Sequence, residues 1–419
     1  MKDKIFSGNS FFTAGGLVDT TSTEPLSVVF LGGSLTSGDI DYEGTSLNDW
    51  NMKWPNTVLR FLNGLFPSRE ITAHNAGLGG TGSQYGNMRF SKDVLAYNPD
   101  LIFIEFSVND MPNIHHERSI NREGCLWRQK FLEGIIRQTM ACDKVPAIVY
   151  VHLPVPAALG SERNLAHRLS CEFKEDLLRY YGIGTIDVYD VMMNEFECRK
   201  KKEPSLTIEE FLKVYYHMYD DGSFDVHPHA WGYKLFNLAV VNALMKEPQK
   251  YLRPFRMRDD IYCKGEDQIV NRTFNYIKCA DERIKYTGDW KIYTAENKLV
   301  TDDKILAIPE GKYSDANDFP NGIAQIYMPT GDESFEFDTE ADALCLPYVS
   351  SRAGLSSSVY ADEEKVGEFT CYSNYQGMNY CGEEVRLPKG KKHIKVVIDK
   401  PTEARYVFRY GYVVEIFEK

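Results

Sequence analysis

The sequence predicts an α/β domain of three layers followed by an all-β sandwich. Over roughly the first 250 of 419 residues, short apolar runs alternate with segments of helical periodicity, the pattern of βα units whose parallel sheet is covered on both faces. Beyond that point short alternating runs are separated by turn signals, as in antiparallel sandwiches. The length of the chain also exceeds the usual length of a single domain, which favours two domains.

Five short segments, 27–31, 70–75, 101–106, 147–151 and 185–188, are the expected strands of the parallel sheet. The run 101–106 (LIFIEF) is almost continuously apolar, as a strand buried on both faces must be. Helices are expected over 54–66, 83–96, 126–141, 164–180 and 231–245. The last of these is apolar nearly all round, so we expect it to be buried. This order of elements predicts a flavodoxin-like α/β/α domain.

The predicted domains are 1–250, with a core over about 25–245, and 260–419. Between them the segment EPQKYLRPFRMRDD, residues 247–260, is polar, contains two prolines and is expected to be a linker. In the second domain the alternating runs 334–338, 343–349, 357–361, 393–398 and 406–417 are the expected strands of the sandwich.

Composition excludes several classes of function. The net charge is −12, which makes nucleic acid an improbable partner because an acidic surface repels phosphates. No apolar stretch is long enough to span a membrane, and the first residues lack the apolar core of a secretory signal. The nine cysteines form no C-x-x-C pair, which favours reduced thiols. We therefore expect a cytoplasmic protein.

Four polar segments follow predicted strands or open predicted helices. They are 32–36 (GGSLT), 75–82 (NAGLGGTG), 107–110 (SVND) and 225–232 (DVHPHAWG). The carboxyl ends of parallel strands open on one edge of a sheet, where ligands sit at the point at which strand order reverses. The segments after the first three strands should therefore meet there, and the fourth can reach the same edge.

These segments bring together the groups of a serine hydrolase. Ser34 can act as nucleophile once a neighbouring base removes its proton, and His227 is the expected base. The oxyanion that forms needs preorganised donors. The backbone N–H groups of Ser34 and Gly80 and the side-chain amide of Asn109 can supply three, and a glycine at position 80 lets the backbone approach the substrate closely.

The four segments resemble the sequence blocks of the SGNH/GDSL hydrolase family. The run 32–35 resembles the first block, with Gly33 where an Asp often stands. Gly80 and Asn109 match the family's oxyanion glycine and asparagine, and His227 with the following proline resembles the fourth block. The resemblance covers about residues 25–245 and implies an esterase that needs neither cofactor nor metal.

One position departs from that pattern. The family usually places a catalytic Asp three residues before the His, where this sequence has Phe224. Either Asp225, two residues before His227, orients the imidazole, or the pair works as a dyad with a backbone carbonyl in that role. We favour Asp225 and regard Asp220 and Asp221 as weaker candidates.

Other motifs have simpler interpretations. Residues 77–82 match G-x-G-x-x-G, with Glu105 downstream, but a dinucleotide fingerprint belongs on the first strand of its unit and here follows the second. His227 and His229 lack further ligands at metal spacing, so no metal site is predicted. Asp110 is expected to cap a helix, and Arg89 is expected to be a solvated charge.

The family resemblance and the appended β domain suggest a carbohydrate substrate that bears a short acyl group, acetate first. This step is an argument by association. A lipase, a thioesterase or an acyltransferase would use the same residues on another substrate. A catalytically silent glycan-binding protein is the alternative from another functional class, and ester turnover separates it from an enzyme.

Overall fold

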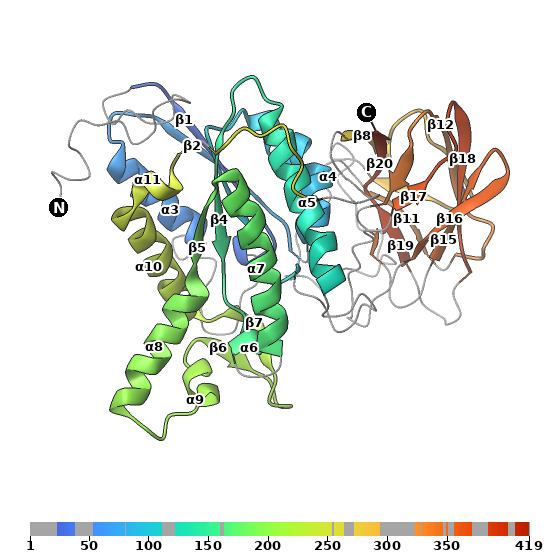
Figure 1. The fold of residues 1–419 in the computed structure, drawn as a ribbon. Coiled ribbons are helices and arrows are strands. Elements are labelled where there is room, and N and C mark those ends of the chain that lie inside the picture. Colours follow the sequence, from blue (N-terminus) through green and yellow to red (C-terminus); the bar gives the residue numbers. More distant parts are fainter. Residues whose placement is uncertain are drawn as a thin grey trace. The chain divides into compact units, whose positions relative to one another are not determined.

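The computed structural model describes residues 23–37, 53–79, 81–110, 122–159, 163–253, 255–263, 272–293, 323–327, 329–346, 349–350, 356–370, 384–400 and 407–418. The chain forms two compact units, Met1–Val270 and Asn271–Lys419. The first combines helices with a parallel sheet, and the second is built from antiparallel strands (Figure 1).

The first unit has a five-stranded sheet in the order β2-β1-β3-β4-β5, with every neighbouring pair parallel. This order is flavodoxin-like, as predicted, and it reverses direction between β1 and β3. The elements of the unit are β1 (Leu26–Gly32), α2 (Ser34–Ser37), α3 (Trp54–Leu65), β2 (Ile71–Gly77), α4 (Ser83–Asp93), η2 (Leu95–Tyr97), β3 (Leu101–Glu105), α5 (Arg122–Met140), β4 (Ala147–His152), α6 (Pro156–Leu159), α7 (Arg163–Tyr181), β5 (Gly184–Asp187), α8 (Val188–Lys202), α9 (Ile208–Leu212), β6 (Tyr216–Met218), β7 (Phe224–Pro228), α10 (Ala230–Lys246) and α11 (Pro248–Tyr251).

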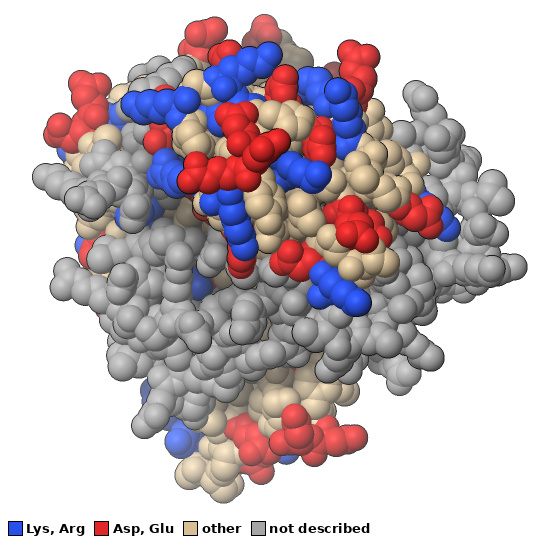
Figure 2. All heavy atoms as spheres, turned by 90° about the vertical axis from the view of Figure 1, so that its right-hand side faces the viewer, with Lys and Arg blue, Asp and Glu red and all other residues tan. Residues whose placement is uncertain are grey.

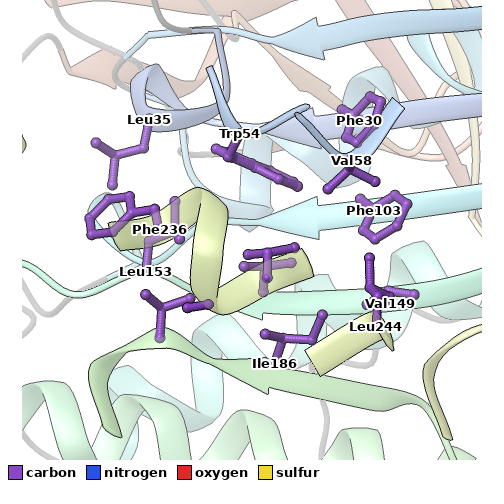
Figure 3. Close-up of a cluster of buried hydrophobic side chains, with 14 of the residues drawn as sticks. Phe30, Leu35, Trp54, Val58, Phe103, Val149, Leu153, Ile186, Phe236 and Leu244 are labelled. Carbon is purple, nitrogen blue, oxygen red and sulfur yellow. The ribbon is translucent and has the colours of Figure 1, made fainter. Parts of the chain in front are cut away.

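The two faces of this sheet carry separate cores. Along β1, Val28 and Phe30 belong to one cluster and Val29 and Leu31 to the other, since alternate residues of a strand point to opposite faces. Helices α3, α8 and α10 cover the first face, and α4, α5 and α7 cover the second. Figure 3 shows the first core, where the ring of Phe30 stacks on that of Phe103 at 5.2 Å. The three-layer prediction is confirmed.

The last long helix, α10, differs from its prediction. Its inner side is buried through Phe236 and Val240, but Trp231 and Leu238 are 63% and 59% exposed on the outer side. The expectation of a helix buried all round is therefore wrong. Apolar residues on every side of a helix permit burial without requiring it, and here the apolar residues on the outer side remain accessible.

The predicted linker, 247–260, and the residues directly after it belong to the first unit and pack into it. Phe255 and Cys263 are buried in the core of the second face. The buried carboxylate of Glu133 accepts hydrogen bonds from the backbone N–H groups of Tyr262, at 2.6 Å, and Cys263, at 2.7 Å. The polar composition of the segment concealed this docking, because its few apolar side chains are enough to anchor it.

The second unit consists of antiparallel sheets, which confirms the predicted all-β class. The sheet orders are β10-β11-β19-β14, β16-β15-β18-β12-β9 and β17-β13-β20-β8. Strands of all three sheets contribute side chains to one apolar core. Phe337, Val396 and Phe408 are among these side chains. The elements are β8 (Arg272–Lys278), β9 (Lys285–Thr287), β10 (Lys291–Tyr293), β11 (Ile323–Tyr327), β12 (Ser334–Thr339), β13 (Ala343–Cys345), β14 (Val349–Ser350), β15 (Ser356–Ala361), β16 (Glu364–Thr370), β17 (Glu384–Arg386), β18 (Lys392–Ile398), β19 (Val407–Tyr410) and β20 (Tyr412–Glu418).

Charges of both signs are interspersed on the face that Figure 2 shows. Ion pairs across strands also mix the two signs in the second unit, such as Glu336 with Lys395 at 3.1 Å between β12 and β18. Such exposed pairs contribute little stability individually. Among the helices that the structure describes, none combines the length and apolarity needed to cross a membrane.

Candidate active site

The sheet brings the predicted nucleophile and an oxyanion residue to the same edge. Ser34 opens α2, two residues after the last residue of β1, and Asn109 lies in the turn after β3. Because β1 and β3 are neighbours and strand order reverses between them, their carboxyl ends form the edge at which ligands of such sheets bind.

His227 joins this edge from a distant part of the chain. Its Nε2 lies 2.7 Å from Ser34 Oγ, although 193 residues separate the two. Both side chains are buried. With Nδ1–H donated to a carboxylate, Nε2 carries the lone pair, so the serine hydroxyl donates this hydrogen bond and is positioned to lose its proton.

Asp225 reaches the imidazole despite its unusual spacing. Its Oδ1 lies 2.6 Å from His227 Nδ1 and also accepts the backbone N–H of His227 at 2.7 Å. Both residues lie on β7, and residues two apart on a strand share a face. The strand thus brings a carboxylate two residues before the histidine to the imidazole, as the commoner spacing does with a carboxylate three residues before it. Asp221 lies in the turn before β7, where it accepts the N–H and hydroxyl of Ser223.

Tyr219 extends the hydrogen-bonded row of Ser34, His227 and Asp225, and the sequence did not predict it. Its hydroxyl donates to Asp225 Oδ2, so both oxygens of this carboxylate are engaged, one by His227 and one by Tyr219. Tyr219 follows β6, the antiparallel partner of β7. The sequence carries no signal for this contact, because it depends on the pairing of two short strands that the sequence did not predict.

The amide of Asn109 lies against the backbone that precedes the nucleophile. Its Nδ2 donates to the carbonyl of Thr81 at 3.2 Å. A Cβ placed on Gly33 would lie 2.7 Å from the same nitrogen, so a larger residue at position 33 would press on this amide. Nδ2 carries two hydrogens, and the second is available to an oxyanion formed at Ser34. Gly80, the third predicted donor, lies outside the described residues.

Asp110 holds the neighbouring loops together. Its Oδ1 accepts the backbone N–H of Ser83 at 2.7 Å at the start of α4, and its Oδ2 pairs with Lys174 at 3.1 Å. Burial is the largest influence and opposes the charge of Lys174, but Asp110, Tyr150 and Cys171 together outweigh it, so the pKa of Lys174 lies above its ordinary value. Asp110 therefore accepts the first backbone N–H of α4 from a separate loop, whereas the N-cap position of this helix is Gly82, so Asp110 is not the N-cap residue of the helix that it contacts.

Glu105 is a buried carboxyl directly beneath the nucleophile helix. It accepts the hydroxyl of Thr36 at 3.0 Å and the backbone N–H of Ser107 at 2.6 Å. Burial raises its pKa above the ordinary value. Glu105 thus ties α2, which bears Ser34, to the turn that bears Asn109. Its inward position removes it from the surface, where the acidic residue of a dinucleotide site would have to stand.

The other sequence candidates do not join the site. Arg89 is buried, not solvated, and donates to Asp93 at 3.2 Å and to the carbonyl of Gly32 at 3.3 Å. Trp54 belongs to the core. Within the described ranges, no group of three or more His, Cys, Asp or Glu side chains is arranged to hold a metal ion.

Solved structures to which this chain is similar include esterases. A two-domain esterase active on acetylated mannans has 20% identity and a TM-score of 0.62 over 96% of this chain and 93% of that one. The same enzyme co-crystallised with mannopentaose has 20% identity and a TM-score of 0.60 over 100% and 93% of the two chains. An acetylxylan esterase from Geobacillus stearothermophilus covers 53% of this chain with 94% of its own, at 16% identity and a TM-score of 0.39.

Comparison of the sequence itself identifies a family over part of the chain. None of the curated proteins matches this chain. Residues 30–235 match the GDSL-like lipase/acylhydrolase family, and this span contains all four polar segments of the site. The α/β part of the chain, over residues 30–235, therefore belongs to the GDSL-like lipase/acylhydrolase family, a family of carboxylic ester hydrolases.

Proposed function

We propose that this protein removes short acyl groups, acetate first, from carbohydrate hydroxyls through an acyl-enzyme on Ser34. The observation that carries the chemistry is the hydrogen-bonded row from Ser34 Oγ through His227 to Asp225, with distances of 2.7 and 2.6 Å. A row of nucleophile, base and orienting carboxylate is the arrangement of acyl transfer on many unrelated folds.

Acylation begins when Ser34 Oγ attacks the ester carbonyl and its proton passes to His227 Nε2. Asp225 holds Nδ1–H and stabilises the imidazolium that forms. The carbonyl oxygen becomes an oxyanion, and we expect Asn109 Nδ2 and the backbone N–H groups of Ser34 and Gly80 to receive it. When the intermediate collapses, the ester C–O bond breaks and His227 gives its proton to the departing alcohol.

Deacylation repeats these steps with water. His227 takes a proton from a water molecule, the hydroxide adds to the acyl carbon, and the same donors receive the oxyanion. The bond to Ser34 Oγ then breaks, and His227 returns the proton to the serine. The free acid leaves, and the row is restored.

The carbohydrate part of the proposal draws its support from the comparisons. A structure that shares this chain's two-part fold is an esterase active on acetylated mannans. At 20% identity that likeness extends to the fold, so the substrate is inferred by analogy. An acyl group as small as acetate also suits an edge where Gly33 and Asn109 lie in close contact.

Acetate release from acetylated manno-oligosaccharides tests the proposal, with p-nitrophenyl acetate, butyrate and octanoate as a series in acyl length. We expect turnover of the oligosaccharides, rates that fall from acetate to octanoate, and no turnover by Ser34→Ala. Unchanged thermal unfolding of that variant would serve as the folding control. Rates that rise toward octanoate, with no release from the sugars, would favour a lipase instead.

A further inference from the structure

Three more rings lie at the β6–β7 ribbon that carries His227: His217 on β6, Tyr219 directly after β6 and His229 directly after β7. Asp225 and His227 share one face of β7, and Tyr219 reaches that face to contact Asp225. The ring of His217, on β6, lies 5.1 Å from that of Tyr219 and 6.1 Å from that of His229. We call His217, Tyr219 and His229 the ribbon rings.

The chemistry of ester cleavage determines which part of a substrate faces these rings. The acyl carbon must bond to Ser34, and its oxyanion must point to the donors beside Asn109. The departing alcohol oxygen must lie within hydrogen-bond reach of His227, which protonates it. The remainder of the alcohol therefore extends past His227, along the ribbon on which this histidine stands.

We propose that the ribbon rings form the subsite for the alcohol part of the substrate, and that they are built to hold a sugar ring. This inference rests on the proposed function. It adds a location and a set of residues to that function.

The properties of the three side chains suit a sugar. Tyr219 is 42% exposed, and His217 and His229 are half-buried. Burial, and next the neighbouring His217, hold the pKa of His229 below its ordinary value, so this ring is uncharged at neutral pH. Flat rings offer apolar faces to the C–H face of a sugar, while their edges carry hydrogen-bonding atoms that can reach its hydroxyls.

A comparison of two substrates isolates the subsite. Acetylated manno-oligosaccharides present a sugar to the ribbon rings, whereas ethyl acetate has an alcohol with no ring to stack. His217→Ala removes the ribbon ring that packs on Tyr219, and His229→Ala removes the ring that packs on His217. Tyr97→Ala is the control, because Tyr97 is 47% exposed near the start of β1, at the other edge of the sheet.

We expect both histidine variants to raise KM for the oligosaccharides by about tenfold, the upper end of what one ring contact supplies. Their kcat/KM on ethyl acetate should equal that of the parent, which also reports correct folding. His217→Phe, which keeps a flat ring, should restore most of the affinity. Tyr97→Ala should behave as the parent on both substrates.

Two results would overturn the inference in different ways. If the parent cleaves the oligosaccharides and both histidine variants keep its KM, the sugar binds elsewhere while the proposed function stands. If the parent cleaves ethyl acetate but no carbohydrate ester, the carbohydrate substrate itself is wrong, and the ribbon rings lose their proposed occupant.

Discussion

Replacing Asp225 by Asn tests the part of the site that departs from the usual spacing. The substitution keeps the shape of the side chain, and its amide oxygen can still accept the two N–H groups of His227 that Oδ1 accepts now, at 2.7 and 2.6 Å. The hydroxyl of Tyr219 can turn to accept from the new amide. What disappears is the negative charge beside an imidazole that must become positive during the reaction.

The size of the effect follows from the distance between the charges. Two unit charges about 4 Å apart at an effective dielectric constant of about 20 interact by roughly 4 kcal/mol. If this interaction is lost from the transition state alone, the rate falls by about a thousandfold. An altered tautomer of His227 would add to the loss, toward the roughly 10⁴-fold known for such triad variants.

The assay is kcat/KM for p-nitrophenyl acetate, with thermal unfolding as a check on folding. Asp221→Asn is the matched control, since Asp221 lies on the surface and its hydrogen bonds to Ser223 stay within the turn before β7. We expect full activity from the control and a loss of at least about a hundredfold from Asp225→Asn. A loss below about tenfold would refute the reasoning and indicate a dyad.

Three further predictions concern the surroundings of the nucleophile. Asn109→Ala should lower kcat for p-nitrophenyl acetate by about 10²–10³ with little change in KM, and a loss below about tenfold would speak against an oxyanion role. Gly77→Ala should lower both the melting temperature and activity, because its Cβ would lie 2.3 Å from the backbone nitrogen of Ser37 in α2. In Gly64→Ala the new Cβ meets nothing within 4 Å, so this control should gain about 0.5–1 kcal/mol in unfolding free energy. Because burial raises the pKa of Glu105 in the folded protein above its ordinary 4.5, its ionisation costs stability as pH rises above that value. The melting temperature of Glu105→Gln relative to the parent should therefore increase from pH 4.5 to pH 8, and a constant or reversed difference would contradict a buried, proton-retaining carboxyl.

The central strands of the parallel sheet could be predicted because burial on both faces demands continuous apolar runs, as in β3. The edge of the sheet that carries the site could also be predicted. Parallel strands bring Ser34 and Asn109 to the same edge, and this requires no knowledge of side-chain contacts. Helix α8 was not predicted, although its buried residues Val188, Met192 and Phe196 recur at the i, i+4, i+8 spacing of a helix. Its signal was Asp187, whose side chain accepts two backbone N–H groups at the start of the helix.

The contacts that complete the site could not be predicted. Strand β7 is short and ends in proline, so the sequence did not reveal that Asp225 and His227 share a strand face. Tyr219 meets Asp225 only because β6 pairs with β7. The sequence also did not predict that Asp110 pairs with Lys174 in the interior, since the identity of a buried partner is decided by tertiary packing.

Glu105 could be predicted in part from the sequence. A single carboxylate within an otherwise apolar strand is visible in the sequence, and it indicates a buried acid that needs partners. The same residue also fits the acidic position of a nucleotide motif downstream of the glycines in 77–82. Its partners, Thr36 and Ser107, distinguish the two interpretations, and they are visible only in the structure.

The central claim is that Ser34 is a nucleophile activated by His227, and covalent labelling tests it most directly. A fluorophosphonate should react with the parent protein, and peptide mapping by mass spectrometry should place the label on Ser34, because an activated serine attacks phosphorus as it attacks carbon. His227→Ala should label far more slowly while remaining folded. A label on another residue, or none on a folded protein, would contradict the account.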